Sequence, residues 1–323
     1  MSTEIKNQPI MSSDQIIERA QEIARKGKRK MVAVAGASDV DVLGALSSAN
    51  ADGILDATLF GDRDKINKCA VEGDIDISKF DIVHNDDVSK FTYEAVKMAA
   101  EGNADVIMKG FVSTSGLLKT VLSHDFNLKT KNLVSHTAVL DIPGYFKLLG
   151  MTDGGMVVRP DLDQKIQIME NSALVFRALG INPVKVALSG AVDFVHDNIP
   201  QTAECRKVIE KVESMGFDDI VIQGPLTFDA ATSKEMASLK NIEGPVAGEA
   251  DVYLVNSIEE CNIIAKSLIN FADTVFAGVI TGAKVPVSLV SRTDTLKNKK
   301  ASVSIACLVA EYYKSSGVLG GAL

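Results

Sequence analysis

Short apolar runs alternate with segments of helical periodicity along the first part of this chain. The runs are largely unalternated, as expected for strands covered on both faces of a sheet, and they lie at residues 31–37, 57–61, 81–84 and 105–109. Between them, apolar residues recur at helical spacing, at residues 40–48, 65–69, 91–100 and 115–122. A further helix is predicted between Ser12, which has the spacing of a capping box with Gln15, and Gly27. This alternation predicts a parallel sheet with right-handed crossovers.

The rhythm changes near residue 140, where a longer run at 133–142 and a short strand candidate at 156–158 interrupt it. Beyond them, helices are predicted at residues 162–179, 203–215, 233–239 and 259–271, and strands at residues 185–188, 220–223, 252–255 and 275–280. A last strand at 285–290 and a helix at 302–313 are expected to pack back on the first part. We therefore predict an α/β protein with two lobes, residues 1–139 with 284–323 and residues 140–283, and a ligand cleft between them.

Composition narrows the class of protein. The 323 residues are 46% hydrophobic and carry a formal net charge of −8, which argues against a dedicated binder of nucleic acids or anionic membranes. No apolar run reaches the length of about 20 residues that a membrane helix needs. The N-terminus lacks a signal-peptide pattern, and the cysteines form no CxxC pair. We therefore expect a cytoplasmic protein in which Lys297, Lys299 and Lys300 could form a local basic cluster for an anionic substrate.

The most informative segment runs from Gly278 to Arg292. It predicts two apolar strands joined by a turn that contains Gly282 and Lys284, and it ends on Ser291 and Arg292. Ligands of α/β sheets bind at the carboxyl ends of strands, and the planar fork of an arginine fits phosphate. The alternative is a surface arginine that follows a helix-capping serine.

A second candidate for anion binding follows the predicted strand at 105–109. Lys109 and Gly110 end this strand, and Ser113 and Thr114 open a helix that carries Lys119. Helix N-termini have free N–H groups and a partial positive charge, which favour phosphate. An ordinary Ser/Thr N-cap explains the same residues equally well, and the GxxxxGK[ST] pattern of a P-loop is absent.

Other polar side chains stand in or near glycine-containing loops. Asp153 lies in a Gly-rich turn near the predicted domain junction, and Gly224 and Asp229 follow a predicted strand. Glycine permits close approach of the backbone to a ligand, so we count these residues as candidates for substrate binding. His136 stands inside an apolar run, where it is either a further candidate or a core histidine.

Several phrases of the sequence, in their order along the chain, resemble one family. They are Met108-Lys109-Gly110, Leu117-Leu118-Lys119, Ser135-His136, Tyr145-Phe146-Lys147, Thr152-Asp153, Pro160-Asp161-Leu162, Gly224-Pro225-Leu226, Ala247-Gly248-Glu249 and Thr281-Gly282-Ala283-Lys284 with Ser291-Arg292. This set resembles the phosphate acetyl/butyryltransferase family, most closely its phosphate butyryltransferase branch. The co-occurrence of the phrases in family order is more specific than any one of them.

The resemblance implies a fold of two α/β/α lobes like those of isocitrate and isopropylmalate dehydrogenases. It also implies the reaction of a short acyl-CoA, butyryl or branched, with phosphate to give an acyl phosphate and CoA. Coenzyme A is then a substrate, and no cofactor or metal ion is obligatory. Family members commonly form homodimers or larger homo-oligomers, so the resemblance implies a homo-oligomer here.

The resemblance also assigns roles to residues. Ser291 would stabilise the charge that develops at the thioester, Arg292 would bind phosphate, and Lys119 would be a second cation. Where the acetyl branch has an aspartate base, this chain has Asn298, so Asp294 is the substitute candidate for the base. The remaining candidates for substrate binding are Lys109, Gly110, Ser113, Thr114, His136, Asp153, Gly224, Asp229, Gly282 and Lys284.

Two other functions stay open at this point. A non-catalytic protein that binds CoA or acyl phosphate would explain why Asn298 replaces the base. A metal- and NAD(P)-dependent decarboxylating dehydrogenase would fit the βαβ pattern if Asp193 and Asp197 shared one helix face and bound a divalent cation. The cluster of substrate-binding arginines that such a dehydrogenase needs is not recognisable in the sequence.

Overall fold

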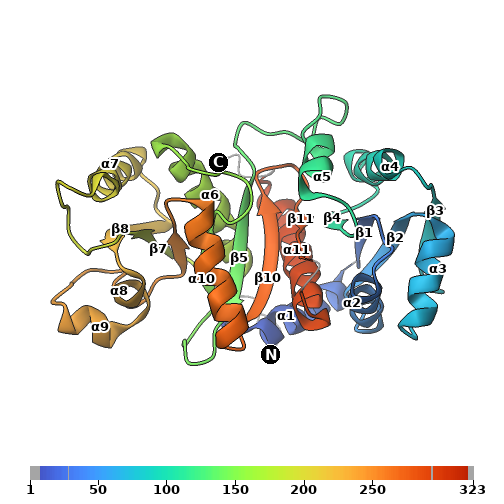
Figure 1. The fold of residues 1–323 in the computed structure, drawn as a ribbon, viewed down its shortest axis with the longest axis horizontal. Helices are drawn as coiled ribbons and strands as arrows, with labels where there is room; N and C mark the ends of the chain where they lie inside the picture. The colour runs from blue at the N-terminus through green and yellow to red at the C-terminus, as the bar shows by residue number, and fades with distance from the viewer. Residues whose placement is uncertain (1–7, 28, 292–293, 319–323) are drawn as a thin grey trace. The chain divides into compact units, whose positions relative to one another are not determined.

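A computed structural model describes residues 8–27, 29–291 and 294–318 (Figure 1). The chain forms two compact units, unit 1 with Met1–Ser12 and Leu133–Val275, and unit 2 with Ser13–Asn132 and Phe276–Leu323. The chain thus changes units at 12/13, 132/133 and 275/276, whereas the sequence predicted changes at 139/140 and 283/284. The N-terminal segment belongs to unit 1 because Ile10 is buried there and its N–H donates to the carbonyl of Leu179 at 2.9 Å.

The sheet of unit 2 has the strand order β3-β2-β1-β4-β11-β10. Its strands are β1 (Lys30–Ala35), β2 (Leu55–Gly61), β3 (Asp81–His84), β4 (Val106–Lys109), β10 (Val275–Thr281) and β11 (Val287–Ser288). The pairs β3–β2, β2–β1, β1–β4 and β4–β11 are parallel, and β10 is antiparallel to β11. The predicted apolar runs therefore do form a mostly parallel sheet, and the residues of β4 are buried throughout.

The helices of unit 2 are α1 (Ser13–Lys26), α2 (Val40–Ala51), α3 (Arg63–Glu72), α4 (Val88–Ala100), α5 (Thr114–Val121) and α11 (Leu296–Ser316). The β1-α2-β2 and β3-α4-β4 crossovers move in opposite directions along the sheet, so right-handed connections place α2 and α4 on opposite faces. Consistently, α11 packs with α1 and α2, while α4 packs with α5 (Figure 1). None of the described helices combines the length and the apolar character needed to cross a bilayer.

The sheet of unit 1 has the strand order β5-β6-β9-β7-β8. Its strands are β5 (Ser135–Asp141), β6 (Leu149–Thr152), β7 (Val184–Ser189), β8 (Ile220–Leu226) and β9 (Val252–Leu254). The pair β5–β6 is antiparallel, and the other pairs are parallel. Its helices are α6 (Leu162–Ala178), α7 (Pro200–Met215), α8 (Phe228–Thr232), α9 (Lys234–Leu239) and α10 (Ile258–Phe271).

The structure differs from the sequence-based prediction in five elements. Residues 156–158 form no strand, because the N–H groups of Met156 and Val157 donate to the carboxylate of Asp153 and not to a neighbouring strand. Strand β6 and helix α8 escaped prediction, and β8 continues to Leu226, beyond the predicted end at residue 223. Helix α11 begins at Leu296 rather than at residue 302, since the Thr295 side chain caps it.

Candidate functional site

The order of strands in unit 2 reverses between β1 and β4. From β1 the chain proceeds through β2 to β3, and then it returns to place β4 on the other side of β1. In open α/β sheets, ligands bind at the carboxyl ends of the strands beside such a reversal. The loops that follow β1 and β4 meet there. The N–H of Gly110 donates to the carbonyl of Ala35 at 3.0 Å, and the N–H of Phe111 donates to the carbonyl of Gly36 at 2.6 Å.

Two glycines allow this meeting of loops. Gly36 has a φ of +77°, which other residues rarely adopt. A Cβ atom on Gly110 would lie 2.1 Å from the carbonyl oxygen of Gly36. Gly110, a candidate for substrate binding, is therefore required by the backbone geometry of the site itself.

The other candidates from this segment surround the end of β4. Ser113 is the N-cap of α5, and its hydroxyl accepts the N–H of Gly116 at 3.1 Å, while Thr114 is the first helical residue. Lys119 is exposed one turn later. Lys109 is only 7% exposed, and its ammonium donates to the carbonyls of Gly110 at 3.3 Å and Val290 at 3.5 Å. The capping role predicted as the alternative for Ser113 is confirmed.

Strand β11 brings Ser291 to the same edge of the sheet. Because β11 runs parallel to β4, with Ser288 opposite Met108, the chain leaves β11 beside Lys109 and reaches the exposed Ser291. The Ser291 N–H donates to Asp294 Oδ2 at 2.5 Å, and the Asp294 N–H donates to the Ser291 carbonyl at 3.2 Å. These two bonds join Ser291 to Asp294, and we call these two residues the Ser291–Asp294 pair. The predicted phosphate ligand Arg292 lies outside the described residues.

Two other candidates lie at the opposite edge of the sheet. Since β10 is antiparallel to β11, the turn that follows β10 is near the start of β11 and not near its end. The Gly282 carbonyl accepts the Thr130 hydroxyl at 2.6 Å, and the Lys284 N–H donates to the Leu128 carbonyl at 2.9 Å. The structure therefore does not bring Gly282 and Lys284 together with Ser291.

The predicted basic cluster is wrong as a free anion site. Each ammonium lies beside a carboxylate: Lys297 pairs with Asp14 at 3.7 Å, Lys299 with Asp41 at 3.2 Å and Lys300 with Asp52 at 2.5 Å. Asn298 is also used by the fold, because it is 5% exposed and its Oδ1 accepts the N–H of Phe276 at 3.2 Å. None of these side chains presents an unpaired charge to a substrate.

In unit 1, Asp153 organises its own loop. Its carboxylate accepts the N–H groups of Gly155 at 2.7 Å, Met156 at 3.0 Å, Val157 at 3.1 Å and His136 at 3.3 Å. Burial raises the pKa of Asp153 to about 6, although these four bonds act in the opposite direction. The group is therefore an anchor of the residue 153–157 loop.

His136 is a core histidine, the second of the two roles that its position allowed. It is 5% exposed, and burial lowers its pKa to about 4, so the ring is neutral at pH 7. The Asp153 loop covers this ring closely, since a Cβ atom on Gly154 would lie 3.4 Å from its Nδ1.

The raised pKa of Asp153 predicts a pH dependence of stability. The folded protein holds this proton up to about pH 6, whereas the unfolded chain loses it near pH 3.8. The carboxyl therefore destabilises the fold progressively as the pH rises through this interval. We expect the free energy of unfolding of the wild type, relative to Asp153→Asn, to fall by about 2 kcal/mol between pH 4 and pH 7. Denaturant unfolding of both proteins measures this difference, and parallel pH profiles would contradict it.

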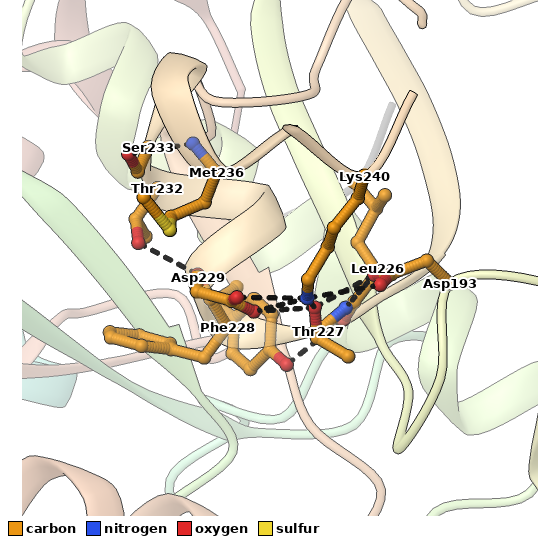
Figure 2. Close-up of polar contacts among 10 residues, drawn as sticks. Asp193, Leu226, Thr227, Phe228, Asp229, Thr232, Ser233, Met236 and Lys240 are labelled. Carbon is orange, nitrogen blue, oxygen red and sulfur yellow. Dashed lines mark hydrogen bonds and ion pairs between the residues drawn. The ribbon is translucent and has the colours of Figure 1, made fainter. Parts of the chain in front are cut away.

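Asp229 lies in a compact polar cluster at the carboxyl end of β8, which Figure 2 shows. The ammonium of Lys240 lies 2.8 Å from Asp229 Oδ2 and 3.2 Å from Asp193 Oδ2, and it donates to the Thr227 hydroxyl at 2.7 Å. The hydrogen bond from Lys240 is the main reason why the pKa of Asp229 is lowered to about 2. Lys240 thus bridges the two carboxylates. The sequence gives no sign of this contact, because Lys240 follows Asp229 by eleven residues.

The arrangement around Asp193 removes the basis of the metal-dependent alternative. Asp193 and Asp197 lie in irregular backbone rather than on one helix face. Within the described part of the chain, no group of three or more acidic, histidine or cysteine side chains is placed to hold a metal ion.

Gly224 allows close packing within the sheet, since a Cβ atom there would lie 2.6 Å from Leu188 Cβ.

Comparison with known proteins gives one consistent result. The model of the phosphate acetyl/butaryl transferase family matches residues 84–307. The chain is 37% identical over 298 residues to the phosphate butyryltransferase of Clostridium acetobutylicum, covering 91% of this chain and 99% of that protein. It is 35% identical over 297 residues to the phosphate butyryltransferase of Clostridium beijerinckii, covering 92% and 97%.

A solved structure agrees with these relatives. The crystal structure of a branched-chain phosphotransacylase from Enterococcus faecalis V583 superimposes with a TM-score of 0.78 at 30% identity, covering 87% of this chain and 99% of that one. Family match, identity and fold all extend over most of the chain, so this protein belongs to the phosphate acetyl/butaryl transferase family.

Proposed function

We propose that this protein is a phosphate acyltransferase that converts a short acyl-CoA and phosphate into an acyl phosphate and CoA, with a preference for butyryl or branched acyl groups. The observation that carries the proposal is the position of Ser291. Ser291 is exposed beyond the carboxyl end of β11, next to Lys109 and the loop that precedes α5. The chain that carries it belongs to the phosphate acetyl/butaryl transferase family. The acyl preference follows the names of the relatives, which are phosphate butyryltransferases and a branched-chain phosphotransacylase.

The chemistry needs positioning and charge stabilisation rather than a covalent intermediate. A phosphate oxygen attacks the thioester carbonyl, an oxyanion forms, and the CoA thiolate then leaves and takes up a proton. In this proposal the Ser291 hydroxyl donates to the oxyanion and Arg292 binds the phosphate, with Lys119 as a second cation. In the reverse direction, Asp294 takes the proton of the CoA thiol. Neither direction requires a metal ion or a redox cofactor.

The alternative of a non-catalytic binding protein depends on Asn298, which has a structural role here. The side chain of Asn298 is buried and accepts the N–H of Phe276, so it supports the start of β10. The presence of asparagine at position 298 therefore does not decide whether Ser291 and Asp294 can take part in catalysis. Binding of CoA without any turnover would favour the alternative, and a large loss of turnover in Arg292→Ala would exclude it.

Four finer statements belong to this proposal. The two units correspond to the lobes of isocitrate and isopropylmalate dehydrogenases, the protein forms homodimers or larger homo-oligomers, it acts in the cytoplasm, and it binds no nucleic acid. In this proposal Asp153 and Asp229 of unit 1 only support the structure. The carboxylate of Asp153 accepts backbone N–H groups, and that of Asp229 pairs with Lys240.

The acyl preference is tested with acetyl-CoA, butyryl-CoA and isobutyryl-CoA as substrates. Each methylene in a fitted apolar pocket contributes about 1–3 kcal/mol, so kcat/KM with a four-carbon acyl group should exceed that with acetyl by about tenfold or more. Release of free thiol in the presence of phosphate measures this ratio. A preference for acetyl-CoA would contradict the assigned acyl group. If none of the three substrates released free thiol, the phosphate acyltransferase reaction itself would be contradicted.

A further inference from the structure

One lysine of the predicted basic cluster is completely buried. Lys299 lies in the first turn of α11, and its side chain is only 1% exposed. Lysine is almost never buried to this extent unless its ammonium is paired. The partners of Lys299 therefore indicate what the residue does.

The Lys299 ammonium joins two segments that are distant in sequence. It donates to the carbonyl oxygen of Asp294 at 2.9 Å and to Asp41 Oδ2 at 3.2 Å, and it lies 3.9 Å from Asp39 Oδ1. Asp39 is fixed in turn, because its side chain caps α2 by accepting the N–H of Val42 at 2.9 Å. The ammonium thus links the start of α2, directly after β1, to Asp294 of the Ser291–Asp294 pair.

We propose that Lys299 is a positioning residue that holds the hydrogen-bonded pair Ser291 and Asp294 in its reactive place, an inference that rests on the proposed function. Lys299 binds the carbonyl of Asp294, and the carboxylate of Asp294 binds the N–H of Ser291. A displacement of the ammonium is therefore transmitted to the backbone of Ser291 through two hydrogen bonds.

The two helices behind this link, α2 and α11, pack against each other. A Cβ atom on Gly44 of α2 would lie 2.9 Å from Leu296 Cδ1 of α11, which is the first residue of that helix. Hydrogen bonds inside a protein are stronger than the same bonds in water, because the local dielectric is low. A misplacement of about 1 Å at a reacting group can cost about 100-fold in rate. A small movement of Ser291 and Asp294 is therefore sufficient to lower turnover.

The test compares Lys299→Met and Asp41→Asn with Lys300→Met. Lys300 is the matched control, because it is the next residue of α11 and also binds α2, through Ser48 at 2.9 Å and the adjoining Asp52 at 2.5 Å, but not Asp294. Asp41→Asn weakens the link from an exposed partner and does not depend on whether Lys299→Met folds. Two readouts are taken: kcat and KM with butyryl-CoA and phosphate, and hydrogen exchange of the Ser291 and Asp294 amides.

We expect Lys299→Met to lower kcat by about 100-fold and Asp41→Asn by about tenfold, with the KM for butyryl-CoA changed less than about threefold in both. Amide exchange at Ser291 and Asp294 should accelerate in both variants, and Lys300→Met should match the wild type. Unchanged exchange and kcat in Lys299→Met would overturn the proposal, as would equal effects in Lys300→Met. If Lys299→Met does not fold, wild-type kcat and exchange in Asp41→Asn overturn it. A wild type without phosphate-dependent turnover would refute the proposed function, and amide exchange alone would then decide on the anchoring.

Discussion

Replacing Ser291 by alanine is expected to lower kcat by about 100- to 1,000-fold, as the loss of one donor to an oxyanion does in other acyl transfers. The hydroxyl acts only when negative charge develops on the carbonyl oxygen, so the affinity for CoA should change by less than about threefold. Ser291 is exposed, and its hydrogen bonds with Asp294 come from its backbone, so the variant keeps its fold. Steady-state kinetics and CoA binding by calorimetry measure the two quantities.

Ser288→Ala is the control for the loss of a hydroxyl. Ser288 lies three residues earlier in β11, is fully buried, and its Oγ has no hydrogen-bond partner in the part of the chain that the structure describes. Its kcat should stay within about twofold of the wild-type value, since it removes no interaction with substrate. Equal losses of kcat and CoA affinity in Ser291→Ala would mean that Ser291 only positions the substrate.

Gly110→Ala is expected to reduce the free energy of unfolding by about 3 kcal/mol, the upper end of the usual cost of overpacking. The added methyl group would lie 2.1 Å from the carbonyl oxygen of Gly36 and 3.1 Å from that of Ala35. Both contacts are to backbone, which cannot move aside as a flexible side chain can. The loops after β1 and β4 must therefore separate, and turnover should fall together with stability.

Gly27→Ala adds the same methyl group at a place with room for it. The nearest contact of a Cβ atom at Gly27 is the Ile23 carbonyl oxygen at 3.5 Å, so its stability should change by less than about 1 kcal/mol. Urea denaturation of the two variants measures the contrast. If Gly110→Ala were as stable as Gly27→Ala, the two loops would not be in the close contact described here.

The sequence predicted the elements whose hydrophobic pattern is long or strongly biased. Strand β3 was placed at its observed residues, and α6 was placed to within one residue. Helix α8, with five residues, is too short to show a helical period. Strand β6 has four residues, as β3 does, so its length alone does not explain why it escaped prediction. The error at residues 156–158 has a different cause, because a carboxylate outside the segment, that of Asp153, takes the N–H groups that a strand would need.

The candidate site was predictable where it depends on the ends of strands. Ser291 and Lys109 were both expected at carboxyl ends, and the parallel pairing of β4 with β11 places them at one edge. Gly282 lies away from Ser291, because two strands joined by a short turn are antiparallel and the turn between them lies opposite the end of the second strand. The link from Lys299 to Asp41 was not predictable, since 258 residues separate the two and periodicity does not report such pairs.

The most direct test of the central claim measures both products in one reaction. Purified protein is incubated with butyryl-CoA, with and without phosphate, and free thiol and acyl phosphate are quantified together. The proposed reaction predicts one acyl phosphate for each CoA released and neither product without phosphate. Thiol release that does not depend on phosphate, or that yields no acyl phosphate, would contradict the assignment of this protein as a phosphate acyltransferase.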